Sequence, residues 1–228
     1  MIDLIYCAGG NKRLQEVALD EGWLLGLRSD SSLSPFPQQF VDVDYKNPDF
    51  LRHISVVQHY RPKYATVPDL PESGTQATDI MRVLRQRDLL APYCGTVFVV
   101  PKLHIQVLAL PADVAIGYSV PSSYGGARYP VSALAGRKIH LLGGSPRKQM
   151  EAYKALAPIA TVTSVDGNYG QKMAVRFARY WADGRWHDHP AKAKGSRDIY
   201  YECWQRTCRA LREAWTQLTT EVTTKKER

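Results

Sequence analysis

The sequence predicts an α/β fold, a (β/α)8 TIM barrel with a C-terminal helical extension. Short apolar runs alternate with segments of helical composition along residues 1–182, which is the pattern of repeated β-then-α units. Most of these runs are continuous rather than alternating, as is typical of parallel strands that are buried on both faces. The chain has 228 residues, 44% hydrophobic and 23% charged, which suits one globular barrel.

Eight apolar runs are expected to form the strands. They cover residues 2–7, 23–27, 39–43, 64–67, 96–100, 114–119, 138–142 and 159–165. Helices are expected where apolar residues recur on one face, or where Gly and Pro mark the ends, over residues 12–22, 48–60, 77–90, 103–110, 147–156 and 171–181. A doubly wound open sheet is the alternative fold, but it normally has five or six strands and a Gly-rich first turn.

Two regions are expected along the chain. Residues 1–182 would form the barrel domain, and residues 183–228 a C-terminal helical appendage outside the eight units. The first residues read as a strand rather than a signal peptide, and no apolar run approaches the ~18 residues of a membrane span. We therefore expect a cytoplasmic protein with reduced thiols, and no membrane partner. Cys7 and Cys94 are interpreted as small buried hydrophobic residues.

The charge balance favours a polyanionic partner. Lys and Arg number 30 against 22 Asp and Glu, a formal net charge of +8 at pH 7. A basic surface of this kind is compatible with nucleic acid, although charge alone does not specify it.

Acidic residues follow several of the predicted strands. In an α/β barrel the loops after the strands build the active site. Like charges that converge there repel one another and raise each other's pKa, which suits nucleophilic and acid–base chemistry. The alternative for each aspartate is a helix cap or a turn. The acidic residues at strand ends are Asp30, Asp42, Asp44, Asp69 and Asp166, and Lys102 follows the fifth strand.

Six short segments resemble a known family in their order along the chain. They are residues 28–32 (RSDSS), 67–69 (VPD), 98–102 (FVVPK), 115–119 (AIGYS), 140–146 (HLLGGSP) and 163–166 (TSVD). The chain resembles the tRNA-guanine (queuine) transglycosylases, and more closely the DpdA-type deazapurine DNA-modification proteins. The resemblance runs over nearly all of residues 1–182.

The resemblance implies a role for each matching residue. Asp166 would be the nucleophile, Asp30 a general acid/base near the ribose, and Asp69 a contact to the incoming base. The backbone of Gly117 and Tyr118 would also contact the base. Lys102 stands in the segment where the family has a glutamine that reads the base, so it is the candidate for that position.

The function implied by the resemblance is the exchange of guanine in DNA for a 7-deazaguanine derivative of the preQ0 kind. The exchange would proceed through a covalent aspartyl-glycosyl intermediate, with DNA and the free deazaguanine base as partners and no cofactor required for the chemistry. Three alternatives are open at this point: hydrolysis of an N-glycosidic bond, base exchange in tRNA, and a relative that binds nucleic acid without catalysis.

A zinc site is a further expectation for residues 183–228. The tRNA enzymes of the family carry three Cys and one His after the nucleophile, a spacing that this chain lacks. His187, His189, Cys203 and Cys208 could instead supply four ligands for a structural Zn²⁺ ion. The alternative is a pair of surface histidines and two half-buried helix cysteines.

Overall fold

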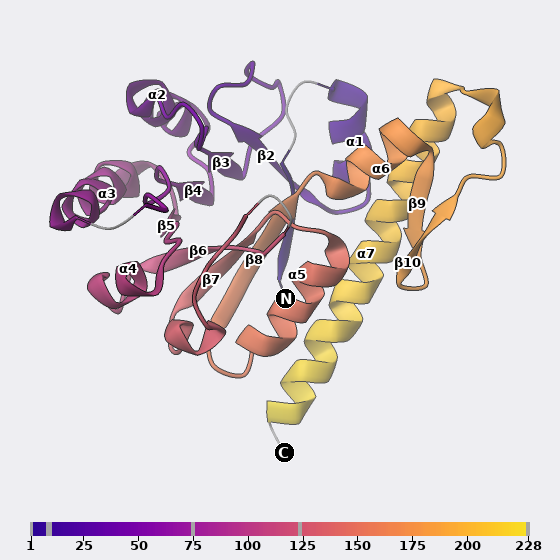
Figure 1. The fold of residues 1–228 in the computed structure, drawn as a ribbon. Coiled ribbons are helices and arrows are strands. Elements are labelled where there is room, and N and C mark those ends of the chain that lie inside the picture. The colour runs from indigo at the N-terminus through magenta and orange to yellow at the C-terminus, as the bar shows by residue number, and fades with distance from the viewer. Residues whose placement is uncertain (1, 8–10, 74–75, 123–124, 227–228) are drawn as a thin grey trace.

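The computed structural model describes residues 2–7, 11–73, 76–122 and 125–226, and its centre is a closed barrel (Figure 1). Eight strands follow one another around the barrel in chain order, and every neighbouring pair is parallel. β8 pairs with β1, with Asp166 opposite Ile5, and this pairing closes the circle. The predicted (β/α)8 barrel is therefore confirmed.

The eight strands are short, and seven of them have three to five residues. They are β1 (Asp3–Cys7), β2 (Leu24–Arg28), β3 (Phe40–Asp42), β4 (Tyr64–Thr66), β5 (Thr96–Val99), β6 (Ala115–Ser119), β7 (Lys138–Leu142) and β8 (Thr161–Gly167). Because side chains alternate along each strand, one set fills the barrel and the other packs under the helices.

The barrel interior is a small cluster of large side chains around a histidine. Ile5, Phe40, Tyr64 and Phe98 pack together inside it. The ring of His140 on β7 lies 4.7 Å from that of Phe40 and 5.1 Å from that of Phe98, measured between centroids. These rings block the barrel below its mouth, so any substrate must bind at the mouth.

Helices cover the outside of the barrel. They are α1 (Lys12–Asp20), α2 (Phe50–Tyr60), α3 (Ala77–Leu90), α4 (His104–Ala109), α5 (Pro146–Leu156), α6 (Tyr169–Phe177) and α7 (Arg197–Lys226), with short 3-10 turns η1 (Ala91–Tyr93), η2 (Val131–Leu134) and η3 (Lys192–Lys194). Local sequence explains several helix starts. The side chains of Asn11 and Asp49 accept backbone N–H groups of the first turns of α1 and α2, and Pro146 opens α5.

The last predicted helix before the appendage is too long. It was expected to run to Trp181, but α6 ends at Phe177 and Ala178 takes a left-handed conformation, with φ of 47°. The chain then forms an antiparallel hairpin of β9 (Arg179–Ala182) and β10 (Arg185–Asp188). The left-handed residue ends the helix, and the Trp181 N–H donates to the Thr207 hydroxyl of α7 at 3.0 Å.

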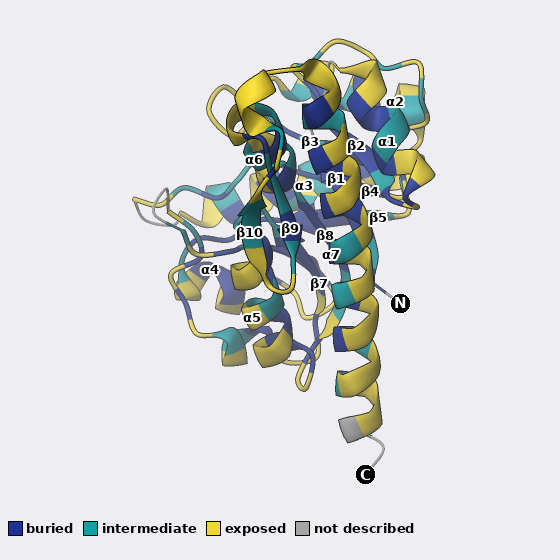
Figure 2. Ribbon diagram, turned by 90° about the vertical axis from the view of Figure 1, so that its right-hand side faces the viewer, coloured by how far each residue is buried: buried dark blue, intermediate teal, exposed yellow. Residues whose placement is uncertain are grey.

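Helix α7 lies along the barrel and completes its outer layer (Figure 2). Its buried face carries Trp204 and Trp215, which belong to the same hydrophobic core as the outer faces of the strands. The Trp204 indole N–H donates to the Leu14 carbonyl of α1 at 3.0 Å, and the Trp23 indole N–H donates to the Cys208 carbonyl at 3.1 Å. The C-terminal region is thus packed against the barrel through buried contacts.

None of the helices in the described part of the chain has the length and apolar character needed to cross a membrane.

We expect Trp204→Ala to lower the free energy of unfolding by about 3–5 kcal/mol, because it removes a buried ring packed on Tyr6 and a hydrogen bond between α7 and α1. Urea unfolding followed by circular dichroism measures the change. Phe177→Ala is the matched control, since Phe177 is 51% exposed and should cost little. A similar small cost for both variants would contradict the view that α7 is part of the core.

Candidate active site

The C-terminal ends of the strands bring a group of polar side chains to the barrel mouth. Cys7, Arg28 and Asp42 end β1, β2 and β3, each two residues after an inward-facing position of its strand. Asp166 near the end of β8 is beside β1 because the barrel is closed. Residues from both ends of the sequence therefore share one rim.

Asp166 is held at the rim by backbone contacts. One carboxylate oxygen, Oδ1, accepts the Gly143 N–H at 3.1 Å. The Gln149 side-chain amide donates to the carbonyl of Asp166 at 2.7 Å and to that of Gly143 at 2.8 Å, and so ties the loop after β7 to β8. Gly143 and Gly144 have φ of 62° and 83°, values that residues with a Cβ atom rarely adopt, so the two glycines allow this turn.

His140 lies directly below Asp166 inside the barrel. Its Nε2 atom is 3.4 Å from Asp166 Oδ1, and its Nδ1 atom is 2.7 Å from the Ser164 hydroxyl. The imidazole is fully buried. Both His140 and the Gly143 N–H face Oδ1, while the Cys7 thiol also contacts the carboxylate.

Asp42 faces the same mouth from β3. The Thr66 hydroxyl donates to its Oδ1 at 2.7 Å and accepts the Val43 N–H at 3.0 Å, which fixes the carboxyl group. Loss of hydration, together with the negative charges of Asp166 and Asp69, raises the pKa of Asp42 to about 7, and the Thr66 hydrogen bond opposes this rise. Asp42 can therefore exchange a proton near neutral pH.

The Thr66 position is itself supported from α2. His53 is fully buried, and its Nε2 atom lies 2.8 Å from the Thr66 carbonyl. Burial lowers the pKa of His53 to about 4, so the neutral ring donates its Nε2–H to that carbonyl near pH 7.

Cys7 lies at the mouth rather than in the packed core alone. Burial raises the pKa of its thiol well above the usual value, and the negative charges of Asp166 and Asp42 add to this effect. The thiol is thus a neutral neighbour of both carboxylates and a poor nucleophile. Cys7 and Cys94 were both expected to be small buried residues, but each is only partly buried and packs against the core.

Asp30 is engaged with a cation on the rim. Arg28 donates to it through Nε, at 3.0 Å from Oδ1, and also through a second guanidinium nitrogen. This hydrogen bond lowers the pKa of Asp30. Arg28 also lies 3.7 Å from Asp44, and Arg52 of α2 donates to the Asp30 carbonyl at 2.9 Å. Asp30 is therefore an ionised partner of Arg28 at neutral pH.

Asp69 and Lys102, both predicted to contact the base, lie together. The Lys102 ammonium nitrogen is 2.6 Å from Asp69 Oδ2. Burial raises the pKa of Asp69, while the charge of Lys102 opposes the rise. The Lys102 N–H donates to the Gln106 side-chain oxygen at 2.6 Å, which orients the backbone after β5.

The two predicted residues of β6 face opposite ways. Gly117 is on the inner side, where a Cβ would approach Leu142 and Val100 side chains at 2.8 and 2.9 Å, so only glycine leaves room for them. The Tyr118 side chain packs outside the barrel, with its ring 5.9 Å from that of Tyr129. A contact of Tyr118 with a substrate at the mouth would have to use its backbone.

The four predicted zinc ligands do not form one group. In the described part of the chain, no three or more His, Cys, Asp or Glu side chains are grouped to hold a metal ion. Cys203 and Cys208 are buried on α7, and their five-residue spacing separates them by about 140° around the helix. The His189 imidazole lies 3.1 Å from Glu202, and His187 contacts the Ala182 carbonyl.

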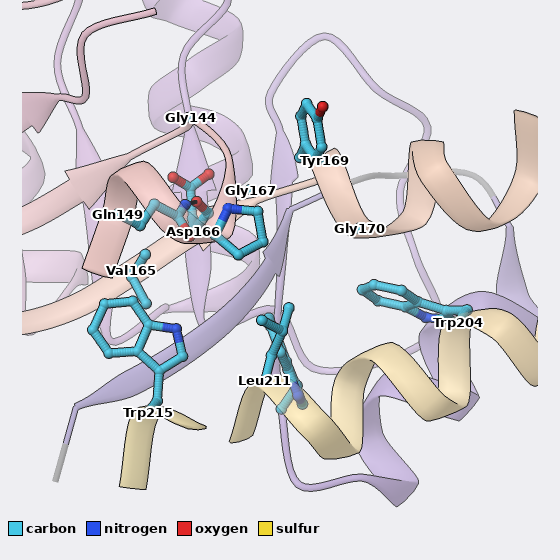
Figure 3. Close-up of a pocket in the computed structure, with 12 residues that line it drawn as sticks. Gly144, Gln149, Val165, Asp166, Gly167, Tyr169, Gly170, Trp204, Leu211 and Trp215 are labelled. Carbon is cyan, nitrogen blue, oxygen red and sulfur yellow. Dashed lines mark hydrogen bonds between the residues drawn. The ribbon is translucent and has the colours of Figure 1, made fainter. Parts of the chain in front are cut away.

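A small cavity lies behind Asp166, between β8 and the helices α5, α6 and α7 (Figure 3). Its volume is about 20 Å³, which is room for one water molecule. Trp204, Trp215 and Asp166 are among the residues that line it. It is too small for a substrate, and the larger cavity of about 320 Å³, lined by Asp3, Tyr64 and Thr161, lies at the N-terminal ends of the strands. The polar side chains at the mouth, where barrel loops build active sites, make the mouth the candidate active site.

Sequence reasoning located the mouth but not the full set of residues. Asp42 was among the acidic residues at strand ends, yet its position did not distinguish it from Asp44. His140 and Cys7 were not expected to contact Asp166. The alternation of side chains along each strand could have indicated this contact, because His140 and Cys7 each stand two residues from a side chain that faces into the barrel.

The fold and the mouth define a (β/α)8-barrel protein with two neighbouring carboxyl groups at the rim, one of which titrates near pH 7. The model of the family of unknown function DUF6610 matches residues 18–216, so the chain belongs to that family. No curated protein sequence matches the chain.

We expect Asp42→Asn to stabilise the protein at pH 8. The pKa of Asp42 is higher in the folded state than in the unfolded chain. The contribution of Asp42 to the free energy of unfolding is therefore greatest at low pH and is lost as the pH rises toward 7. Removing the charge should restore up to about 4 kcal/mol at pH 8 and almost nothing at pH 4. Thermal unfolding at both pH values measures this.

Asp30→Asn is the control with the opposite sign, because the pKa of Asp30 is lowered in the folded state. That variant should be slightly less stable than the wild type at pH 8. A stabilised Asp30→Asn variant, or an unchanged Asp42→Asn variant, would contradict the assignment.

Proposed function

We propose that the protein is a transglycosylase that exchanges guanine in DNA for a 7-deazaguanine derivative, with Asp166 as the nucleophile. One observation carries the chemical part: the fixed Asp166 carboxylate shares the mouth with Asp42, whose carboxyl group titrates at a pKa of about 7. The identity of the base and of the nucleic acid comes from the resemblance of the ordered loop segments.

The proposed first step forms a covalent bond to the sugar. Asp166 Oδ2 attacks C1′ of the nucleotide, and the bond from C1′ to N9 of guanine breaks with its electron pair on the base. The negative charge at the rim stabilises the positive charge that develops on the sugar, as carboxylates do in glycosidases. The Gly143 N–H holds Oδ1, and His140 lies 3.4 Å from the same oxygen, so we assign the attack to Oδ2.

The proposed second step reverses the first with a different base. N9 of the deazaguanine attacks C1′, the bond to Asp166 Oδ2 breaks, and the carboxylate is restored. The departing guanine takes up one proton, and the entering base gives up one. We assign both transfers to Asp42 rather than to Asp30, because Arg28 keeps Asp30 ionised while Asp42 gains and loses a proton near pH 7. No cofactor takes part in these steps.

Three further features support a base-exchange site on nucleic acid. Lys102 and Asp69 provide a hydrogen-bond donor and an acceptor beside each other, as recognition of a heterocyclic base requires. The net charge of +8 suits a phosphate backbone. A target base must leave its stack to reach the mouth, which costs a few kcal/mol in a duplex.

We expect Asp166→Asn to lower base exchange by about 10³-fold or more, since it removes the nucleophile. Mass spectrometry of nucleosides from DNA incubated with the protein and a deazaguanine measures the exchange, and intact-protein mass spectrometry detects the covalent adduct. Asp183→Asn is the control, because Asp183 is exposed at the hairpin tip. Full exchange by Asp166→Asn would rule out the mechanism. Release of guanine without incorporation of the deazaguanine would indicate a hydrolase. Incorporation into tRNA instead of DNA would show that tRNA is the substrate.

The pH dependence of kcat/KM should show a transition near pH 7 that belongs to Asp42. Asp42→Asn should remove this transition and lower the rate by about 10²–10⁴-fold. Asp30→Asn should keep the transition, since Asp30 is ionised throughout that range. A transition that persists in Asp42→Asn would show that another group transfers the proton.

A further inference from the structure

The helix that follows Asp166 presents an unusual outer face. α6 begins three residues after Asp166, and Figure 1 shows it extending away from the mouth across the end of α7. Its inner face is made of Gly170 and Ala174, both buried. A Cβ on Gly170 would come within 3.0 Å of Thr207 and 3.1 Å of Trp204 on α7, so glycine permits this close contact and fixes the direction of α6.

The outer face of α6 combines cations and aromatic rings. We call it the α6 stripe, and it consists of Tyr169, Lys172, Arg176 and Phe177. Tyr169, Lys172 and Arg176 are spaced at i, i+3 and i+7, so they lie on one side of the helix. Tyr169 is 40% exposed and Phe177 is 51% exposed, and both cations are exposed. Exposed side chains of this size occur elsewhere on the protein, as at Tyr45 and Leu51, so it is their combination with the cations of α6 that distinguishes this face.

The two cations of the α6 stripe have no side-chain partner in the described part of the chain. Neither Lys172 nor Arg176 makes a side-chain hydrogen bond or ion pair with any residue that the structure describes. By contrast, Arg179 is paired with Asp188 at 2.6 Å. Between residues 169 and 197 the chain has seven Lys and Arg against two Asp, so this short segment carries most of the net charge of +8.

Tyr169 connects the stripe to the candidate active site. Its ring packs against Trp186 of the β9–β10 hairpin, with centroids 5.8 Å apart, and Trp186 in turn packs on Trp181. One side of the tyrosine ring is therefore supported by the hairpin while the ring stays exposed near Asp166 (Figure 3). Proteins that bind single-stranded nucleic acids combine exposed aromatic rings, on which bases stack, with cations that contact the phosphates.

We infer that the α6 stripe binds the DNA strand next to the target nucleotide, with Lys172 and Arg176 on phosphates and Tyr169 stacked on a flanking base. This inference rests on the proposed function, because it identifies the surface that would hold the substrate of the Asp166 site. A flanking nucleotide held beside β8 would keep an unstacked target base at the mouth.

The test measures binding without turnover, using the full chain and no deazaguanine. A fluorescent single-stranded DNA oligonucleotide is titrated with wild-type protein and with Lys172→Glu/Arg176→Glu, and anisotropy is recorded at several salt concentrations. We expect the double variant to bind at least about tenfold more weakly, and the slope of log Kd against log salt to fall by about 1.5, as two lost phosphate contacts require. Lys172→Gln/Arg176→Gln replaces it if charge reversal prevents folding, with a smaller loss in the same direction.

Two matched controls distinguish binding by the α6 stripe from a general effect of the protein's net charge. Arg85→Glu/Lys154→Glu makes the same change in net charge at exposed positions, on α3 across the barrel from β8 and in the last turn of α5. It should bind within about twofold of wild type. Tyr169→Ala should weaken binding by about fivefold or more, while Tyr169→Phe, which keeps the ring, should not.

The outcomes distinguish the surface from the chemistry. Loss of binding in the stripe variants supports the inference even if no base exchange is ever detected. Equal losses in the stripe and control variants would overturn it, as would unchanged binding by the stripe variants in a protein that exchanges bases. No DNA binding by the wild type, or a clear preference for RNA, would overturn it as well.

Discussion

The pairing of β8 with β1 is the constraint on which the candidate site depends. It places Asp166, from the last strand of the barrel, beside the first strand, with Ile5 opposite it in register. Without that closure the carboxylate would lie at an open sheet edge, far from Asp42 on β3. Closure also shields the barrel interior from water, and this loss of hydration, followed by the charge of Asp166, raises the pKa of Asp42.

Asp166 and Asp42, two neighbouring carboxyl groups at the mouth, have different surroundings. Asp166 accepts a backbone N–H and stands over the buried imidazole of His140. Asp42 accepts a hydrogen bond from the Thr66 hydroxyl and faces the charges of Asp166 and Asp69. The proposed glycosyl transfer needs one carboxylate that attacks the sugar and a second carboxyl group that transfers a proton, and Asp42, with a pKa of about 7, suits the second role.

The C-terminal region connects stability to the proposed substrate surface. α7 buries Trp204 and Trp215 against the barrel, and Gly170 allows α6 to lie close to α7. The direction of α6, and so the position of Tyr169, Lys172 and Arg176, follows from that packing. A region expected as an appendage thus supports the helix that begins next to Asp166.

The sequence alone determined the barrel, the order of its strands and the acidic character of its mouth, because continuous apolar runs and the residues after them are local signals. It did not distinguish Asp42 from Asp44, because only the folded barrel shows which carboxyl group loses its hydration. It also did not predict the β9–β10 hairpin, since the left-handed turn at Ala178 is stabilised by contacts with α7. The contact between His140 and Asp166 and the separation of the four expected zinc ligands depend on which side chains face each other across strands and helices. That property belongs to the tertiary structure.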